Sequence, residues 1–173
     1  MLVLGIDPGV ASTGFAIAGQ GKNGQLEAVE YGVVRTPPTM PLAGRLGAIC
    51  RALEDLGTAH RPSVMAVEQL FFGRSARNVF AVGQARGAAL VAAARLGLEV
   101  CEYTPVQVKQ AVTGYGGASK QQVQAMVKAL YGLPGLPRPD DAADALAIAA
   151  CCLHSAPLRA LLSGRTGAAA VLP

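Results

Sequence analysis

The segment VMAVEQLFF, residues 64–72, restricts the possible folds of this chain more than any other feature. It is apolar apart from Glu68 and Gln69, as expected of a strand that other elements cover on both faces. Strands of this kind occur mostly in sheets with helices packed on both sides. Glu68 stands out within it, because a buried carboxylate needs a partner or a metal ion.

The rest of the chain supplies the other elements of such a sheet. MLVLGID, TGFAIAGQ and LEAVEYGVVRT predict three antiparallel strands, with a hairpin turn at residues 21–24, and LEVCEYTP predicts a fifth strand. Helical spacing of apolar residues begins at Pro41 and recurs over 78–96, VQVKQAVTG, SKQQVQAMVKALYGL and PDDAADALAIAACCLH. We therefore expect an α/β fold: a mixed five-stranded sheet, three antiparallel strands then two parallel ones, with helices on both faces.

The length and composition indicate a single domain. A chain of 173 residues can bury a substantial core, and we expect the domain to span residues 1–156. The segment 157–173 is expected to be a flexible tail, because SGRTGAAAVLP lacks periodicity and aromatic anchors. No signal-peptide pattern and no apolar run near the ~20 residues of a membrane helix is seen, so we expect a cytoplasmic protein without a membrane partner. The four cysteines lack metal-ligand spacing and predict buried free thiols.

The charge is unevenly distributed along the chain. The formal net charge is +4, and the segment 71–139 carries more than this excess. It holds eight lysines and arginines against only Glu99 and Glu102. Such a segment indicates a basic face for a polyanion, although ordinary solvated helix faces would give the same composition.

Four carboxylates lie where the predicted elements would bring them together. Asp7 and Glu68 each close the apolar part of a strand, so they converge if the first and fourth strands are neighbours. Asp141 and Asp144 are three residues apart and share one helix face. Taken singly, Asp7 could cap a turn and the two later acids could complement a helix dipole. Taken together, four carboxylates would repel one another, and a divalent cation relieves that repulsion.

The ligand types indicate which cation and which chemistry. Carboxylate oxygens without histidine or cysteine favour Mg²⁺ or Mn²⁺ over zinc. Two such ions held roughly 3.5–4 Å apart stabilise the attacking and leaving oxygens of a phosphodiester displacement. An acidic metal pocket beside a basic surface is what a nuclease requires, because lysines and arginines hold the phosphates.

Five separated segments of the chain form a recognisable pattern. They are GIDPG (5–9), VEQLFFG (67–73), VGQARGAAL (82–90), VKQAVTGYGGASKQQVQAMV (108–127) and DAADALAIA (141–149). In order and spacing, over about residues 1–155, they resemble the RuvC Holliday junction resolvases of bacteria. The resemblance implies an RNase H-like fold, a homodimer, and Mg²⁺-dependent nicks in two strands of like polarity across a four-way DNA junction. It also implies a RuvA–RuvB branch-migration complex as partner.

The resemblance also assigns roles to residues. It implies that the metal ligands, which would hold two Mg²⁺ ions or Mn²⁺ in their place, are Asp7, Glu68, Asp141 and Asp144. The family's phosphate-contacting lysines fall on Lys109 and Lys120, and its base-contacting aromatic on Phe71. From their position after Glu68, we expect Arg74 and Arg77 to bind DNA as well. Asp140 is an additional acid that could compete as a ligand, and some relatives have histidine at the position of Asp141.

Two other functions fit parts of the sequence. GIDPGVASTG resembles the phosphate-binding hairpin of the actin and sugar-kinase superfamily, but the chain has no room for the second domain those proteins need. A module that binds branched DNA without cutting it would not need all four acids. Paired cuts require two active sites and hence a dimer; the small-residue helix over 78–96 is our candidate interface, unless that face packs on its own sheet.

Overall fold

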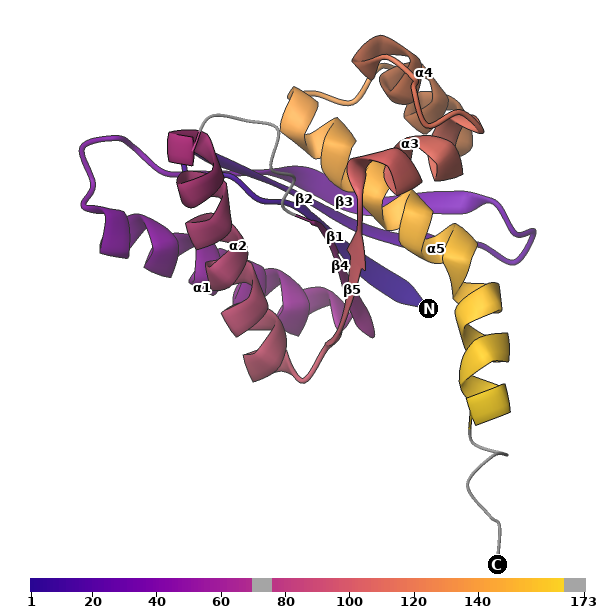
Figure 1. The fold of residues 1–173 in the computed structure, drawn as a ribbon, viewed down its shortest axis with the longest axis horizontal. Helices are drawn as coiled ribbons and strands as arrows, with labels where there is room; N and C mark the ends of the chain where they lie inside the picture. Colours follow the sequence, from indigo (N-terminus) through magenta and orange to yellow (C-terminus); the bar gives the residue numbers. More distant parts are fainter. Residues whose placement is uncertain (70–75, 167–173) are drawn as a thin grey trace, which may run out of the picture.

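A five-stranded mixed sheet forms the centre of the computed structural model, which describes residues 1–69 and 76–166 (Figure 1). The strand order is β3-β2-β1-β4-β5. β1 pairs with β2, and β2 with β3, in antiparallel orientation, whereas β1–β4 and β4–β5 are parallel. The predicted sheet is therefore confirmed. Its strands are β1 Leu2–Asp7, β2 Ser12–Gln20, β3 Leu26–Arg35, β4 Val64–Glu68 and β5 Glu99–Tyr103.

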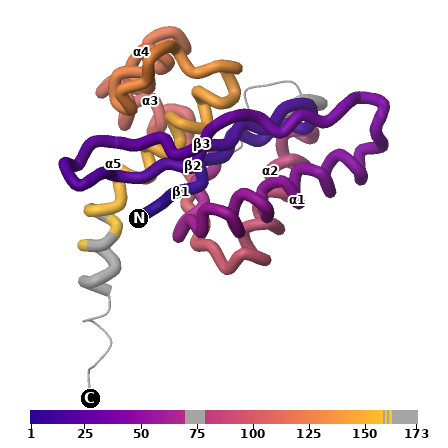
Figure 2. The backbone as a smooth tube through the Cα atoms, turned by 180° about the vertical axis from the view of Figure 1, so that it is seen from behind, coloured from indigo at the N-terminus to yellow at the C-terminus, as the bar shows by residue number. Residues whose placement is uncertain are grey.

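Helices cover both faces of this sheet, as predicted. Figures 1 and 2 show α1 and α2 on one face and α3, α4 and α5 on the other. Two of the helices begin at a capping side chain: Thr104 caps the N-terminus of α3 and Ser119 that of α4, each within a capping box. The helices are α1 Leu42–His60, α2 Ala76–Leu96, α3 Pro105–Thr113, α4 Lys120–Leu130 and α5 Asp140–Thr166.

The strand β4 is buried on both faces, which explains its unbroken apolar sequence. Val64 and Ala66 belong to the core beneath α3, α4 and α5, whereas Met65 and Val67 belong to the core shared with α1 and α2. The strand ends at Glu68 and is therefore shorter than the predicted 64–72. Residues 70–72 of that prediction lie outside the described part of the chain.

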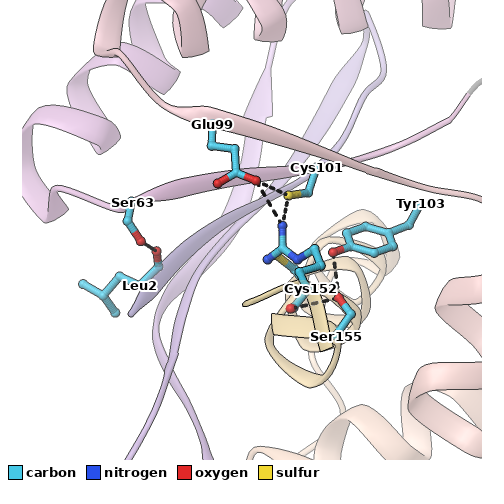
Figure 3. Close-up of polar contacts among 8 residues, drawn as sticks. Leu2, Ser63, Glu99, Cys101, Tyr103, Cys152 and Ser155 are labelled. Carbon is cyan, nitrogen blue, oxygen red and sulfur yellow. Dashed lines mark hydrogen bonds and ion pairs between the residues drawn. The ribbon is translucent and has the colours of Figure 1, made fainter. Parts of the chain in front are cut away.

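The helix α5 runs well beyond the predicted end near residue 154. Its last turns are attached to β5: the hydroxyls of Tyr103 and Ser155 lie 2.8 Å apart, and Figure 3 shows this pair beside Cys101 and Cys152. The Arg159 guanidinium donates to the Cys152 thiol at 3.4 Å and also contacts Cys101. The extension thus depends on contacts with a strand about 50 residues earlier. The domain boundary at residue 156 stays a prediction.

The helix α2 has two different faces. Ala85, Ala89 and Ala92 are fully buried in the core shared with α1 and the sheet, so this part of the small-residue surface packs within the chain. Phe80 and Val91, by contrast, are 76% and 48% exposed. Within the described residues, the segment Val79–Leu96 alone is long and apolar enough to span a membrane, which is weak evidence because core helices pass the same test.

Candidate active site

The side-chain alternation of two neighbouring strands brings the first two acids together. Val3, Gly5 and Asp7 follow one another at every second position of β1 and therefore face α5. The same alternation in β4 places Glu68 on that face after Val64 and Ala66. β1 and β4 are parallel, with Ile6 opposite Val67, so Asp7 and Glu68 occupy equivalent ends of adjacent strands. The predicted convergence is confirmed.

Two glycines allow α5 to bring the other two acids to this place. A Cβ on Gly5 would overlap the carbonyl oxygen of Ala145, and one on Gly14 would overlap that of Asp141. The backbone of α5 therefore lies directly on β1 and β2, closer than any residue with a side chain would permit. The first turn of α5 reaches the end of β1 as a result.

Three of the four predicted acids form one compact group. Single carboxylate oxygens of Asp7, Asp141 and Asp144 all lie within 4.8 Å of one another. Glu68 lies outside this group, but it lines the same cavity and its charge acts on Asp7. The cavity has a volume of about 400 Å³ and is also lined by Lys109 and Lys120. The four predicted acids and the two predicted lysines thus line one cavity.

The electrostatics of the group are those of a cation site. Burial raises the pKa of Asp7 from 3.8 to about 8, and the negative charges of Asp144 and Glu68 add to the effect. Burial also raises the pKa of Asp144, although its hydrogen bond with Lys120 acts in the opposite direction. The raised pKa of Asp7 therefore favours a proton on this carboxyl at neutral pH, which a bound cation would displace.

Lys120 balances part of this negative charge. Its ammonium lies 3.1 Å from Oδ2 of Asp144 and 3.4 Å from Oδ2 of Asp140. Burial lowers the pKa of Lys120, but its bonds to the two carboxylates outweigh this, and the pKa is raised overall. Asp140 also accepts a hydrogen bond from Nε2 of Gln124 at 3.0 Å and is not a member of the compact group. Its carboxylate is thus directed towards α4.

Lys109 differs from Lys120 in having no such partner. It lies on α3 at the edge of the same cavity. Among the described residues, its ammonium makes no hydrogen bond or ion pair. Lys109 is therefore available to bind an anion that enters the cavity.

Sequence reasoning missed Ser12. Its hydroxyl donates a hydrogen bond of 2.5 Å to Oδ2 of Asp141, which orients that carboxylate. The signal was present, because an antiparallel hairpin places the start of its second strand beside the end of its first. In the observed register Asp7 lies opposite Gly14, two residues from Ser12.

The remaining predicted DNA-binding residues lie at or beyond the edge of the described chain. Phe71 and Arg74 fall within residues 70–75, outside the described residues. Arg77 lies in the first turn of α2, and its side chain is likewise outside the description. Their proposed contacts with DNA stay predictions.

The residues present fit a hard divalent cation. All three members of the compact group offer carboxylate oxygens, and it contains no histidine or cysteine. Burial raises the pKa of Asp7, the negative charges of Asp144, Glu68 and Asp141 raise it further, and Lys120 offsets only part of this effect. Oxygen ligands with uncompensated negative charge favour Mg²⁺ or Mn²⁺ over softer metals.

Comparison with known proteins identifies one family of similar sequences. The sequence model of the family described as crossover junction endodeoxyribonuclease RuvC matches residues 3–152. The crossover junction endodeoxyribonuclease RuvC of Heliobacterium modesticaldum is 53% identical over 155 residues, which cover 90% of this chain and 95% of that protein. The corresponding protein of Syntrophomonas wolfei is 49% identical over 94% of both chains.

A solved structure confirms the fold. The structure of Thermus thermophilus RuvC in complex with Holliday junction substrate superimposes with a TM-score of 0.86 at 39% identity, covering 92% of this chain and 96% of that one. The predicted RNase H-like fold is thereby confirmed. Because the family model matches residues 3–152 and a relative is 53% identical over 90% of the chain, the chain belongs to the RuvC family of crossover junction endodeoxyribonucleases.

Proposed function

We propose that this chain is a structure-selective endonuclease that resolves four-way DNA junctions by paired, metal-dependent nicks in two strands of like polarity, in DNA recombination and repair. One observation carries the proposal. Asp7, Asp141 and Asp144 meet at the end of β1, in a cavity whose rim holds Lys109 and Lys120. Acidic metal ligands beside basic phosphate contacts are the arrangement that phosphodiester hydrolysis needs.

Within this proposal, Asp7, Glu68, Asp141 and Asp144 hold Mg²⁺, with two ions per site and Mn²⁺ as a substitute. The cation, when bound, supplies charge stabilisation for the attacking and leaving oxygens. Ser12 holds the Asp141 carboxylate in one orientation through its hydrogen bond. Asp140 is bonded to Gln124 and Lys120, which supports a role outside the metal-ligand set.

The two lysines would hold DNA on one side of the metal ligands. Lys109, without a partner among the described residues, is ready for a phosphate. Lys120 would exchange its bonds to Asp144 and Asp140 for phosphate once a cation neutralises the acids. Phe71, Arg74 and Arg77 are proposed to contact the junction beside this site, the phenyl ring by stacking on a base.

Paired nicks imply a homodimer, since one chain supplies one set of ligands. We propose the outward face of α2 as the dimer interface. Phe80, Gly87 and Val91 recur at helical spacing, the first and last are exposed, and a Cβ on Gly87 would meet open space. Residues 1–156 would form the nuclease domain and 157–173 a tail. We further propose a cytoplasmic location and the RuvA–RuvB branch-migration complex as partner.

The test is cleavage of a synthetic four-way junction, with a linear duplex of the same sequence as substrate control. We expect nicks at two symmetric positions with Mg²⁺ or Mn²⁺, and none with Ca²⁺ or EDTA. Asp7→Asn should abolish cutting while junction binding stays intact, because it removes one ligand and one repulsive charge. Asp55→Asn, the same change at an exposed position of α1, is the matched control.

The result that would overturn the proposal is equally defined. Nicking that persists in excess EDTA would exclude a metal-dependent reaction. Cleavage of the linear duplex at the same rate would exclude structure selectivity. Sedimentation of the same preparation should show a dimer at micromolar concentration, and a monomer that still makes paired cuts would contradict the proposed assembly.

A further inference from the structure

A second groove lies on the other side of Asp141, and the proposed reaction does not yet use it. It has a volume of about 680 Å³ and opens widely to solvent. Asp141 lines both this groove and the cavity that holds the two lysines, so the two depressions meet at a proposed metal ligand. The lining residues of the second groove are Ser12, Arg35, Arg138, Pro139, Asp140 and Asp141.

The two arginines reach this groove from different elements. Arg35 is the last residue of β3 and lies opposite Ser12 in the sheet register. Arg138 lies in the segment that leads into α5, three residues before Asp141. The hairpin β2–β3 and the segment before α5 thus place two cations beside the acidic site.

Both arginines are exposed and without a direct partner. Within residues 1–69 and 76–166, neither guanidinium makes a hydrogen bond or an ion pair. Four other arginines are engaged: Arg45 with Thr36, Arg86 with Glu102, Arg95 with Glu54 and Arg159 with Glu99. Arg35 and Arg138 differ from these four in having no bonded partner among the described residues, and they alone of the described arginines line this groove.

The acids in the groove do not supply that anion. The Asp140 carboxylate is bonded to Gln124 and Lys120 on the α4 side. Asp141 accepts the hydrogen bond of Ser12 and belongs to the compact carboxylate group. The positive charge of Arg138 acts on Asp140 and helps to lower its pKa, but neither acid forms a hydrogen bond or ion pair with Arg35 or Arg138 among the described residues, and both arginines are exposed.

We propose that Arg35 and Arg138 form a subsite for a backbone phosphate of the DNA strand that is cut. This inference rests on the proposed nuclease function. A strand that crosses the metal ligands with one phosphate at Lys109 and Lys120 must continue on the far side of Asp141, where the second groove lies. Guanidinium groups suit this position, because their planar fork binds a phosphate with two parallel hydrogen bonds.

The two depressions meet at Asp141, so a strand that occupies both would be held on both sides of the bond to be broken. Contacts on both sides fix the scissile phosphate against the metal ligands, whereas contacts on one side leave it free to pivot. Arg35 and Arg138 are therefore positioning residues that touch the substrate backbone away from the reacting phosphorus.

The first test measures salt dependence with Arg35→Ala, Arg138→Ala and the double variant. Each substitution should lower the slope of log affinity against log salt for junction binding by about one unit per lost phosphate contact. Lys22→Ala is the matched control, because it also removes one exposed cation but lies in the β2–β3 turn at the opposite end of the sheet. Arg35→Lys should recover most of the slope.

The second test locates the contact. Methylphosphonates, which are uncharged, are placed one at a time along the strand that is cut. In the wild-type protein, we expect slower cutting at positions on both sides of the nick. In the double arginine variant, the effect should vanish on one side only, and in Lys109→Ala it should vanish on the other side.

The outcomes separate the inference from the function on which it rests. If the wild-type protein cuts junctions but the double variant keeps the wild-type slope and methylphosphonate pattern, the subsite is refuted and the nuclease function stands. If the arginine and lysine variants lose sensitivity at the same positions, the opposite-side placement is refuted. A wild-type protein that binds and cuts no junction would remove the proposed function itself.

Discussion

Asp7→Asn should stabilise the metal-free protein. The wild-type carboxyl is buried among other acids, and its pKa is raised from 3.8 to about 8. In the unfolded chain the same carboxyl ionises near pH 4, so folding at neutral pH requires it to take up a proton. Asparagine removes this cost while keeping nearly the same volume.

The size of the effect follows from the pKa. Between its two values the folded state binds one more proton than the unfolded state, so stability falls by about 1.4 kcal/mol for each pH unit between about pH 4 and pH 8. At pH 7, the carboxyl lies 3.2 units above its ordinary pKa of 3.8, which corresponds to about 4 kcal/mol. Asp7→Asn should therefore gain about 4 kcal/mol at pH 7 and almost nothing near pH 4.

Urea denaturation in EDTA at several pH values measures this gain. Asp55→Asn is the control, because the same change at an exposed site should leave stability nearly unchanged. In a second series with 10 mM Mg²⁺, the wild-type protein should be more stable than Asp7→Asn. The cation stabilises the wild-type site, whereas the variant would have lost one of the proposed ligands. Equal stability of both proteins in EDTA at pH 7, or a gain that does not depend on pH, would refute the reasoning.

Two other substitutions test how α5 is held. Gly14→Ala should displace the start of α5, because its Cβ would overlap the carbonyl oxygen of Asp141; we expect a loss of about 1–3 kcal/mol in urea denaturation and weaker Mg²⁺ binding by calorimetry. Gly135→Ala, whose Cβ would meet nothing within 4 Å, is the control and should bind Mg²⁺ normally. Tyr131→Phe removes the buried hydrogen bond from its hydroxyl to the carbonyl oxygen of Leu146, 3.0 Å long, and should cost about 1–2 kcal/mol in urea denaturation without changing Mg²⁺ affinity. Unchanged stability of Tyr131→Phe would mean that water replaces this bond.

The sequence was sufficient to predict those structural features that a local pattern of residues determines. Asp7 and Glu68 each close the apolar part of a strand, which predicted their convergence for neighbouring strands, and the segment SKQQVQAMVKALYGL was predicted as the helix that the structure has at Lys120–Leu130. The three-residue spacing placed Asp141 and Asp144 on one face of α5. The strand ends and the helix faces depend on residues close to one another in the chain, so periodicity could reveal them, whereas the pairing of β1 with β4 was a condition of the prediction.

What the sequence could not predict depends on contacts between distant segments. Arg35 reaches the site through the register of β3 against β2, which shifts at a bulge between Ile17 and Ala18. The additional turns of α5 rest on Arg159 and its bonds to β5. The sequence also could not predict whether Ala89 packs against the sheet of its own chain or against a second copy. Small residues permit close packing in either case.

The distance along the chain between the partners of the site also has a consequence for synthesis. Ser12 and Asp141, which share a hydrogen bond, are 129 residues apart, and the ribosome makes the first long before the second. At about 5–20 residues per second, the acids of α5 follow Asp7 by roughly 7–27 seconds. During this interval the nascent chain carries Asp7 but not the other two members of the compact carboxylate group. The group is therefore complete only when the last helix has been made and has docked on the sheet.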